Sequence, residues 1–227
     1  MMSPIIWVLF AIAIIIPICA HLKLKMTFSK YLKVDSAKGI NGAMVAQRML
    51  ASNGIHDVSV EMTQGKLSDH YDPKAKAVRL SPEVYSGTSL ASLGVAAHEV
   101  GHAVQHSQGY FPLEFRSTLV PVANIGSMAA FPVIIIGFIS GSSGFLYIGI
   151  ALLATVLAFQ VVTLPVEFNA SNRAIGQLKD QGFIEPQEMS GVQKVLKAAA
   201  LTYVAAVLVT VLELVRLLII AKILGDD

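Results

Sequence analysis

The residues at positions 98 to 102, HEVGH, have the types and the spacing that could activate a water molecule on a metal ion. Residues four apart share one face of an α-helix, so His98 and His102 can offer their imidazoles to a single ion. Glu99 is adjacent to the first histidine and can take a proton from metal-bound water. This pattern predicts a zinc site for hydrolysis. The alternative is a helix whose two histidines hydrogen-bond with Glu99 and bind no metal.

A catalytic zinc usually has three protein ligands and one open position. The longer pattern H-E-x-x-H-x-x-G-x-x-H would supply a third histidine. In this chain, however, Gln105 occupies the position of its glycine and Gln108 the position of its last histidine. His106 lies one further helical turn along, about 6 Å in rise from His102, and cannot easily share a tetrahedral ion. We therefore expect His106 to face the substrate or the helix surface, rather than to support a ligand.

A downstream carboxylate is the other source of a third ligand, and the candidates are Glu114, Glu167, Asp180, Glu185 and Glu188. We favour Glu167, because Pro165 predicts the end of an apolar run and a restart of the helix beside it. An even number of predicted membrane spans separates His102 from Glu167, which places both on one side of the membrane. The alternative for Glu167 is a charge that the helix dipole favours at a helix start.

The composition indicates a membrane protein. Apolar residues make up 54% of the chain and charged residues 14%, against about 45–50% and about 25% in soluble domains. The net charge of +2 and the lack of a basic run argue against nucleic acid as a partner. The single cysteine, Cys19, excludes an internal disulfide.

Four apolar runs approach the length of about 20 residues that a membrane span needs. The predicted organisation is transmembrane spans at 4–22, 119–139, 145–164 and 198–220, a metallopeptidase domain with the HEVGH helix at 23–117, and a helix with the third ligand at 165–197. No Lys or Arg precedes the first run, which therefore predicts a retained span and not a cleaved signal peptide.

Basic residues near the predicted span ends indicate the orientation in the membrane. One side carries Lys23, Lys25, Lys30, Lys33, Lys38, Arg116, Arg173, Lys179, Lys194 and Lys197, and the other carries Lys222. This bias predicts a multi-pass protein of the inner cell membrane with the metal site in the cytoplasm and both termini outside.

The pair Glu213 and Arg216 inside the fourth span is interpreted as a salt bridge on one helix face.

The segment before the motif predicts two strands, 58–62 and 76–80, around a polar, turn-rich stretch at 68–74. We expect 78–80 to form an edge strand near the metal helix that could pair with an extended peptide. The stretch 40–53 predicts an amphipathic helix ending at Gly54.

Hydrolysis also needs a donor for the oxyanion, and the candidates are His70, Tyr71, Tyr110 and Arg173. His70 and Tyr71 could equally be loop residues held by Asp69 and Asp72.

Three segments carry a family resemblance: HEVGHAVQ from position 98, EFNASNRA from position 167, and LSDHYDPKAKAVRLS from position 67. Together they resemble the YugP-type neutral zinc metallopeptidases of bacterial membranes and, more distantly, the HtpX-like heat-shock proteases and CAAX prenyl proteases. The resemblance covers nearly the whole chain. It implies one catalytic zinc held by His98, His102 and Glu167, with Glu99 as the base.

In the distant relatives an aspartate four residues after the glutamate ligand helps to orient a ligand histidine. Ser171 occupies that position in this chain, so Asn169, Ser171 or Asn172 could take the role.

The expected fold is mainly α: an integral membrane protein with four transmembrane helices and a small α+β, zincin-like (gluzincin) catalytic domain in the cytoplasm. The expected function is a zinc metalloendopeptidase, a hydrolase acting on peptide or protein substrates associated with the lipid bilayer. The alternative is a membrane scaffold or a substrate-binding pseudoprotease with a structural zinc. Structural zinc usually has four ligands, often including cysteine, and the only cysteine lies in the first span.

Overall fold

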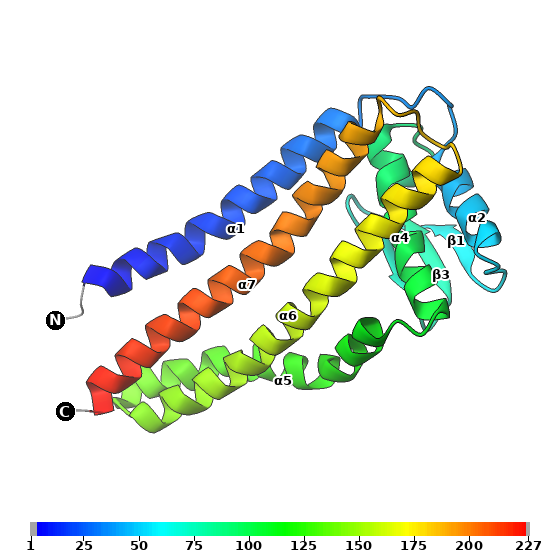
Figure 1. Ribbon diagram of the computed structural model, residues 1–227. Helices are drawn as coiled ribbons and strands as arrows, with labels where there is room; N and C mark the ends of the chain where they lie inside the picture. The colour runs from blue at the N-terminus through cyan, green and yellow to red at the C-terminus, as the bar shows by residue number, and fades with distance from the viewer. Residues whose placement is uncertain (1–3, 226–227) are drawn as a thin grey trace. The chain divides into compact units, whose positions relative to one another are not determined.

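The computed structural model describes residues 4–225 and is mainly helical, with one small sheet (Figure 1). The elements in chain order are α1 (Pro4–Tyr31), α2 (Gly42–Ser52), β1 (Ser59–Met62), β2 (His70–Asp72), β3 (Ala77–Leu80), α3 (Pro82–Tyr85), α4 (Leu90–Ser107), α5 (Phe111–Ser140), α6 (Ser143–Asp180) and α7 (Met189–Gly225). They divide into two compact units. The helical unit contains the described residues within 1–21, 115–164 and 201–227, and the motif unit contains 22–114 and 165–200.

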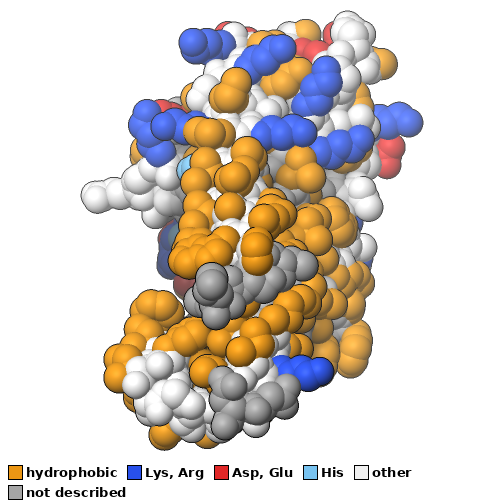
Figure 2. Space-filling view, turned by 90° about the vertical axis from the view of Figure 1, so that its left-hand side faces the viewer, with side chains coloured by type: hydrophobic (Ala, Val, Ile, Leu, Met, Phe, Trp, Pro, Cys, Tyr) orange, Lys and Arg blue, Asp and Glu red, His pale blue; other side chains and the backbone are white. Residues whose placement is uncertain are grey.

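Four helices of the described chain are long and apolar enough to cross a membrane. They are Ile6–Tyr31, Phe111–Ser140, Ser143–Asp180 and Met189–Gly225, and an 18-residue stretch within each has a mean hydropathy of 2.2, 2.1, 2.3 and 2.5, respectively. Their large apolar side chains are widely exposed, among them Trp7, Ile125, Met128, Phe131 and Ile139. Figure 2 shows such side chains covering a face of these helices. Exposed apolar surface of this kind is expected where lipid is the surrounding solvent.

The structure confirms one prediction made from the sequence of these helices and contradicts another. Arg216 and Glu213 do form an ion pair on α7, and the Arg216 guanidinium lies 5.0 Å from the centre of the Phe10 ring. The predicted helix break at Pro165 is wrong, because α6 runs without interruption from Ser143 to Asp180. A proline inside a helix removes one backbone donor, and helices of membrane proteins tolerate this because other groups satisfy the freed carbonyl.

The sheet of the motif unit has the order β1-β3-β2. β1 pairs with β3 in parallel, with Ser59 opposite Ala77, and β2 pairs with β3 antiparallel, with Tyr71 opposite Val78. The predicted strands at 58–62 and 76–80 are therefore confirmed as β1 and β3. The prediction that 78–80 lies at an edge is wrong: β2 forms within the stretch expected to be a turn and occupies that edge, so β3 is central.

The predicted amphipathic helix at 40–53 is confirmed as α2. The Asn41 side chain caps its start by accepting a hydrogen bond from the Met44 N–H, and Gly54 follows its end with a φ of 71°. Its buried face packs against α4, and β3 lies against α4 as well. These elements enclose an apolar core that includes Val45, Met49, Leu80, Leu93, Val100, Leu178 and Val192. This core fixes the helix that carries the HEVGH motif.

Candidate metal centre

The HEVGH residues lie on α4, a helix that is buried along most of its length. Its start is capped by Ser89, whose side chain accepts a hydrogen bond from the Ser92 N–H. Small residues line much of the buried face, leucine and valine fill other core positions, and Glu99 and Gln105 are buried polar residues. His98, Glu99 and His102 are therefore carried on a helix that packing holds on several sides.

Gly101 allows α4 to approach α6 closely. A Cβ atom placed on Gly101 would lie 2.7 Å from the Ala170 carbonyl oxygen and 3.1 Å from the Ala170 Cα. Real Cβ atoms essentially never come within 3.0 Å of another heavy atom, so only glycine fits this backbone contact. Ala170 lies three residues after Glu167, and the contact thus brings the carboxylate of α6 to the histidines of α4.

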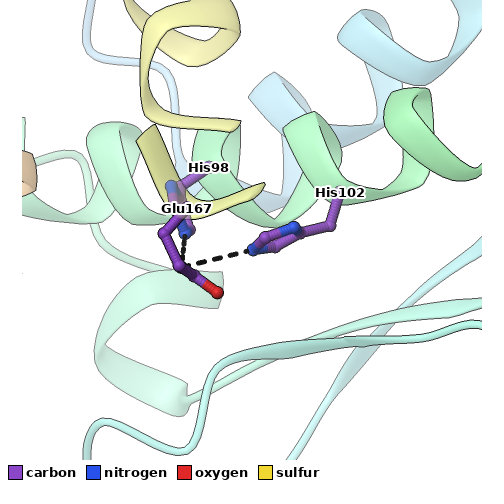
Figure 3. A group of neighbouring side chains, drawn as sticks. All are labelled: His98, His102 and Glu167. Atoms are coloured by element: carbon purple, nitrogen blue, oxygen red, sulfur yellow. Dashed lines mark ion pairs between the residues drawn. The ribbon is translucent and has the colours of Figure 1, made fainter. Parts of the chain in front are cut away.

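The side chains of His98, His102 and Glu167 converge on one point between α4 and α6 (Figure 3). The Glu167 Oε2 atom lies 3.3 Å from His98 Nε2 and 3.7 Å from His102 Nε2. The two imidazole planes are almost perpendicular, at 84°. The three potential ligand atoms lie within 4.8 Å of one another, so this group could hold a metal ion.

The donor set suits zinc. Two imidazole nitrogens and one carboxylate oxygen are a known ligand set for catalytic zinc. Ligand atoms about 2.0–2.2 Å from a tetrahedral zinc are separated from one another by about 3.3–3.5 Å, close to the distances from Glu167 to the two histidines. Glu167 Oε2 is moreover buried without a hydrogen-bond partner among the described residues. A bound cation would satisfy this buried oxygen.

Burial and neighbouring charges shift the pKa values of groups at the centre, among them Glu99 and His102. Burial raises the pKa of Glu99 above its usual value, although the neighbouring His98 and His102 oppose this shift. Burial by itself would lower the pKa of His102, but the carboxylates of Glu167 and Glu99 outweigh it and raise that pKa. A carboxylate with a raised pKa holds a proton more readily, as a general base in neutral solution requires.

Each of the two candidate ligand histidines has a hydrogen-bond partner at its Nδ1 atom. His98 Nδ1 lies 3.2 Å from the Ser171 hydroxyl, so the residue at the aspartate position of the distant relatives does contact a candidate ligand histidine. His102 Nδ1 lies 3.0 Å from Gln105 Oε1. Such partners orient metal-binding imidazoles.

Gln105 was absent from the predicted site. Its spacing of three residues from His102, on the same helix face, was the available signal.

Asn169 and Arg173 extend this arrangement along α6. The Gln105 Nε2 group donates to Asn169 Oδ1, and the Arg173 Nε–H donates to the same oxygen. A second nitrogen of Arg173 donates to Gln108, and its guanidinium lies 6.0 Å from the centre of the Tyr110 ring. Asn169 and Arg173 are thus linked by hydrogen bonds to Gln105, which in turn contacts His102.

The remaining predicted residues lie around α4 and the sheet. The Tyr71 hydroxyl of β2 lies 2.8 Å from His106 Nδ1 of α4, and His106 is exposed as expected. His70 is also exposed, with Nδ1 2.8 Å from the Ser68 carbonyl oxygen.

The aspartates expected to hold these residues have other partners. Asp69 accepts hydrogen bonds from Ser81, and Asp72 accepts from the Lys74 and Ala75 N–H groups and from Arg79. Of the other candidate carboxylates, Glu188 accepts from the backbone N–H groups of Ala37 and Glu185.

Comparison with known proteins agrees with this chemistry. A family described as "Putative neutral zinc metallopeptidase" matches residues 6–222. The protein "Putative membrane protease YugP" of Bacillus subtilis (strain 168) is 48% identical over 201 residues, which cover 88% of this chain and 89% of that protein. No solved structure matches the chain.

Proposed function

This chain belongs to the neutral zinc metallopeptidase family, and on that premise we propose that it is a membrane-embedded zinc metalloendopeptidase. The observation that carries the proposal is the convergence of His98, His102 and Glu167 beside Glu99. The three potential ligands supply a zinc-type donor set, and Glu99, which follows His98 in the sequence, is a buried carboxylate that interacts electrostatically with all three. The name of the Bacillus relative supports protease activity at a membrane.

The residues of the centre would share the hydrolysis of an amide bond. His98, His102 and Glu167 would hold zinc, which when bound lowers the pKa of a coordinated water and polarises the scissile carbonyl. Glu99 accepts a proton from the attacking water and delivers it to the leaving amine. The C–N bond then breaks to give a carboxylate-bearing product and an amine. The raised pKa of Glu99 suits both proton transfers.

An extended substrate would bind along an edge of the sheet. β2 is an edge strand that lies against α4, and its Tyr71 contacts His106 of that helix. Backbone groups at a free edge can pair with an added strand and hold it in one orientation. We therefore place the substrate at β2, in the position that the sequence had suggested for 78–80. Tyr71 and His106 are then the candidate groups nearest the bound peptide.

We further propose that the motif unit is a gluzincin-type catalytic domain that faces the cytoplasm. The basic residues within 23–116 and 166–197 support this side of the membrane, and both termini would then lie outside. A site tethered to the bilayer in this way would act on membrane proteins or on their cytoplasmic segments. Neither nucleic acid nor a soluble small molecule is needed as a partner.

The competing function is a membrane scaffold or a substrate-binding pseudoprotease with a structural zinc. Structural sites usually have four protein ligands, whereas three potential ligands meet at this centre in the described chain. A fourth position open to water favours catalysis.

The experiment compares the detergent-purified full-length chain with its Glu99→Gln variant, measuring bound zinc and cleavage of casein and of a membrane-protein substrate. Glutamine keeps the size of the side chain but cannot accept a proton. We expect about one zinc per chain in both proteins and cleavage by the wild type alone, with a rate reduced by about 100-fold or more in the variant. Equal cleavage by both would refute the role of Glu99. Zinc without cleavage in either would favour the scaffold.

A further inference from the structure

Gln105 is a glutamine without exposed surface in the middle of the motif unit. Burying an amide costs free energy unless its polar atoms find hydrogen-bond partners. Gln105 Oε1 lies 3.0 Å from His102 Nδ1, while Gln105 Nε2 donates to the Val166 carbonyl at 2.8 Å and to Asn169 Oδ1 at 3.0 Å. The Gln105 side chain therefore contacts His102, a candidate zinc ligand on α4. It also contacts Val166 on α6, which directly precedes the candidate ligand Glu167.

The direction of these hydrogen bonds follows from Arg173. A guanidinium group only donates, and Arg173 Nε lies 2.7 Å from the Asn169 side chain, so the Asn169 atom at this contact is its oxygen. The Gln105 atom that faces this oxygen must then be the NH₂ group. The Val166 carbonyl requires the same orientation independently, because a carbonyl only accepts. Two separate anchors thus turn Gln105 Oε1 toward His102.

This orientation selects one form of the His102 ring. A neutral imidazole has one N–H and one bare nitrogen, and the partner of one nitrogen decides which is which. Because Gln105 presents an acceptor, His102 carries its hydrogen on Nδ1. The lone pair then lies on Nε2, the atom that faces Glu167.

His98 is held differently. Its partner is the Ser171 hydroxyl, which can donate or accept and so selects neither form.

We propose that Gln105 is a positioning residue that presets His102 in its metal-binding tautomer and ties it to α6 beside Glu167. The proposal rests on the zinc site of the proposed function. Partners of this kind typically change metal affinity by about 10- to 100-fold when they are removed. We expect Gln105 to have a larger effect than Ser171, because Ser171 leaves the tautomer of His98 free.

The test measures zinc affinity of the full-length protein in detergent by competition with a chromophoric chelator. Gln105→Met keeps the length of the side chain and removes its polar atoms, and it should weaken zinc binding by about 10- to 100-fold. Ser171→Ala should weaken binding less. Gly176→Ala is the matched control, because a Cβ placed on Gly176 of α6 meets no atom within 4 Å, and its affinity should stay within about twofold of the wild type.

A second readout separates positioning from general destabilisation. Nuclear magnetic resonance of isotope-labelled histidine in the metal-free protein reports which ring nitrogen carries the hydrogen, and the His102 signal is the one absent from a His102→Gln variant. We expect Nδ1–H in the wild type and a mixture in Gln105→Met. An Nε2–H form in the wild type would overturn the proposal even if Gln105→Met failed to fold.

The two proposals fail in different ways. If the wild type binds zinc and Gln105→Met binds it equally well, the positioning role is wrong while the zinc site stands. If the wild type shows Nδ1–H on His102 but binds no zinc, the tautomer assignment holds and the proposed function fails, and with it the role of Gln105 in metal binding.

Discussion

Replacing Gly101 with alanine would place a methyl group in the backbone contact between α4 and α6. The new Cβ would lie 2.7 Å from the Ala170 carbonyl oxygen and 3.2 Å from the carbonyl carbon. These are backbone atoms of a helix and cannot rotate away. Restoring the contact to 3.4 Å, the lower limit of ordinary contact, requires the helices to separate by about 0.7 Å.

That separation acts directly on the metal centre, because Gly101 lies between His98 and His102 while Ala170 lies one helical turn after Glu167. Functional groups must be held to within about 0.5 Å to work, so a shift of about 0.7 Å exceeds the tolerance. We expect Gly101→Ala to lose about 1–3 kcal/mol of stability from overpacking. Zinc affinity should fall by at least about tenfold, as for the loss of a supporting contact.

The assay is zinc competition together with thermal unfolding in detergent, and Gly176→Ala is the matched control. Gly176 is also a helical glycine of the motif unit, on α6, but a Cβ placed there meets no atom within 4 Å. Alanine in a helix interior is favoured over glycine by about 0.5–1 kcal/mol, so the control should unfold at an equal or higher temperature and bind zinc normally. Wild-type zinc affinity in Gly101→Ala would refute the reasoning.

Three further predictions concern stability, pH and metal removal. Asp69→Ala should lower the unfolding temperature, because the buried Ser81 loses the acceptor for its N–H, at a cost of about 1–3 kcal/mol. Asp69→Asn keeps an acceptor and should leave the unfolding temperature nearly unchanged, so equal losses in both variants would contradict this explanation. Zinc affinity should fall as the pH drops, beginning above the ordinary histidine pKa of 6.5, because the raised pKa of His102 lets protons compete with the metal. Chelator titrations from pH 8 to pH 5.5 test this, and a zinc affinity that does not change with pH would count against it. Removing zinc with a chelator should lower the unfolding temperature, by an amount equivalent to about 2.7 kcal/mol when free zinc had been 100 times its Kd; an unchanged temperature would mean that folding does not depend on the site.

The sequence was sufficient for the part of the site that lies on one helix. The spacing of His98 and His102 determines that they share a face wherever that segment is helical, and the structure places both on α4. Glu167 needed an argument across two predicted membrane spans and a family resemblance. No local pattern encodes the approach of α6 to α4, which depends on the fit of Gly101 against Ala170.

The sheet shows where local patterns are insufficient. β2 spans three residues within a polar stretch that has no alternation of apolar side chains, and it exists because it pairs with β3. Missing this strand led to the wrong edge for β3. Pro165 was misleading in a different way: its local preference predicts a helix boundary, but α6 continues through it from Ser143 to Asp180.

Gln105 illustrates a third limit. The sequence offered its spacing of three residues from His102, but its proposed role depends on partners that come from α6, 61 and 64 positions away. A buried glutamine cannot be recognised before its burial is known.

The zinc content of the Glu167→Ala variant tests the central claim most directly, because this residue is the proposed ligand that comes from a second helix, α6. The variant and the wild type would be purified in the same detergent, dialysed against a weak chelator and analysed for metal by mass spectrometry. We predict about one zinc per chain in the wild type and a clear loss of bound zinc in the variant, as a fall in affinity of about tenfold or more would produce. Full zinc occupancy in Glu167→Ala would contradict the account, because the third ligand would then have to be another residue.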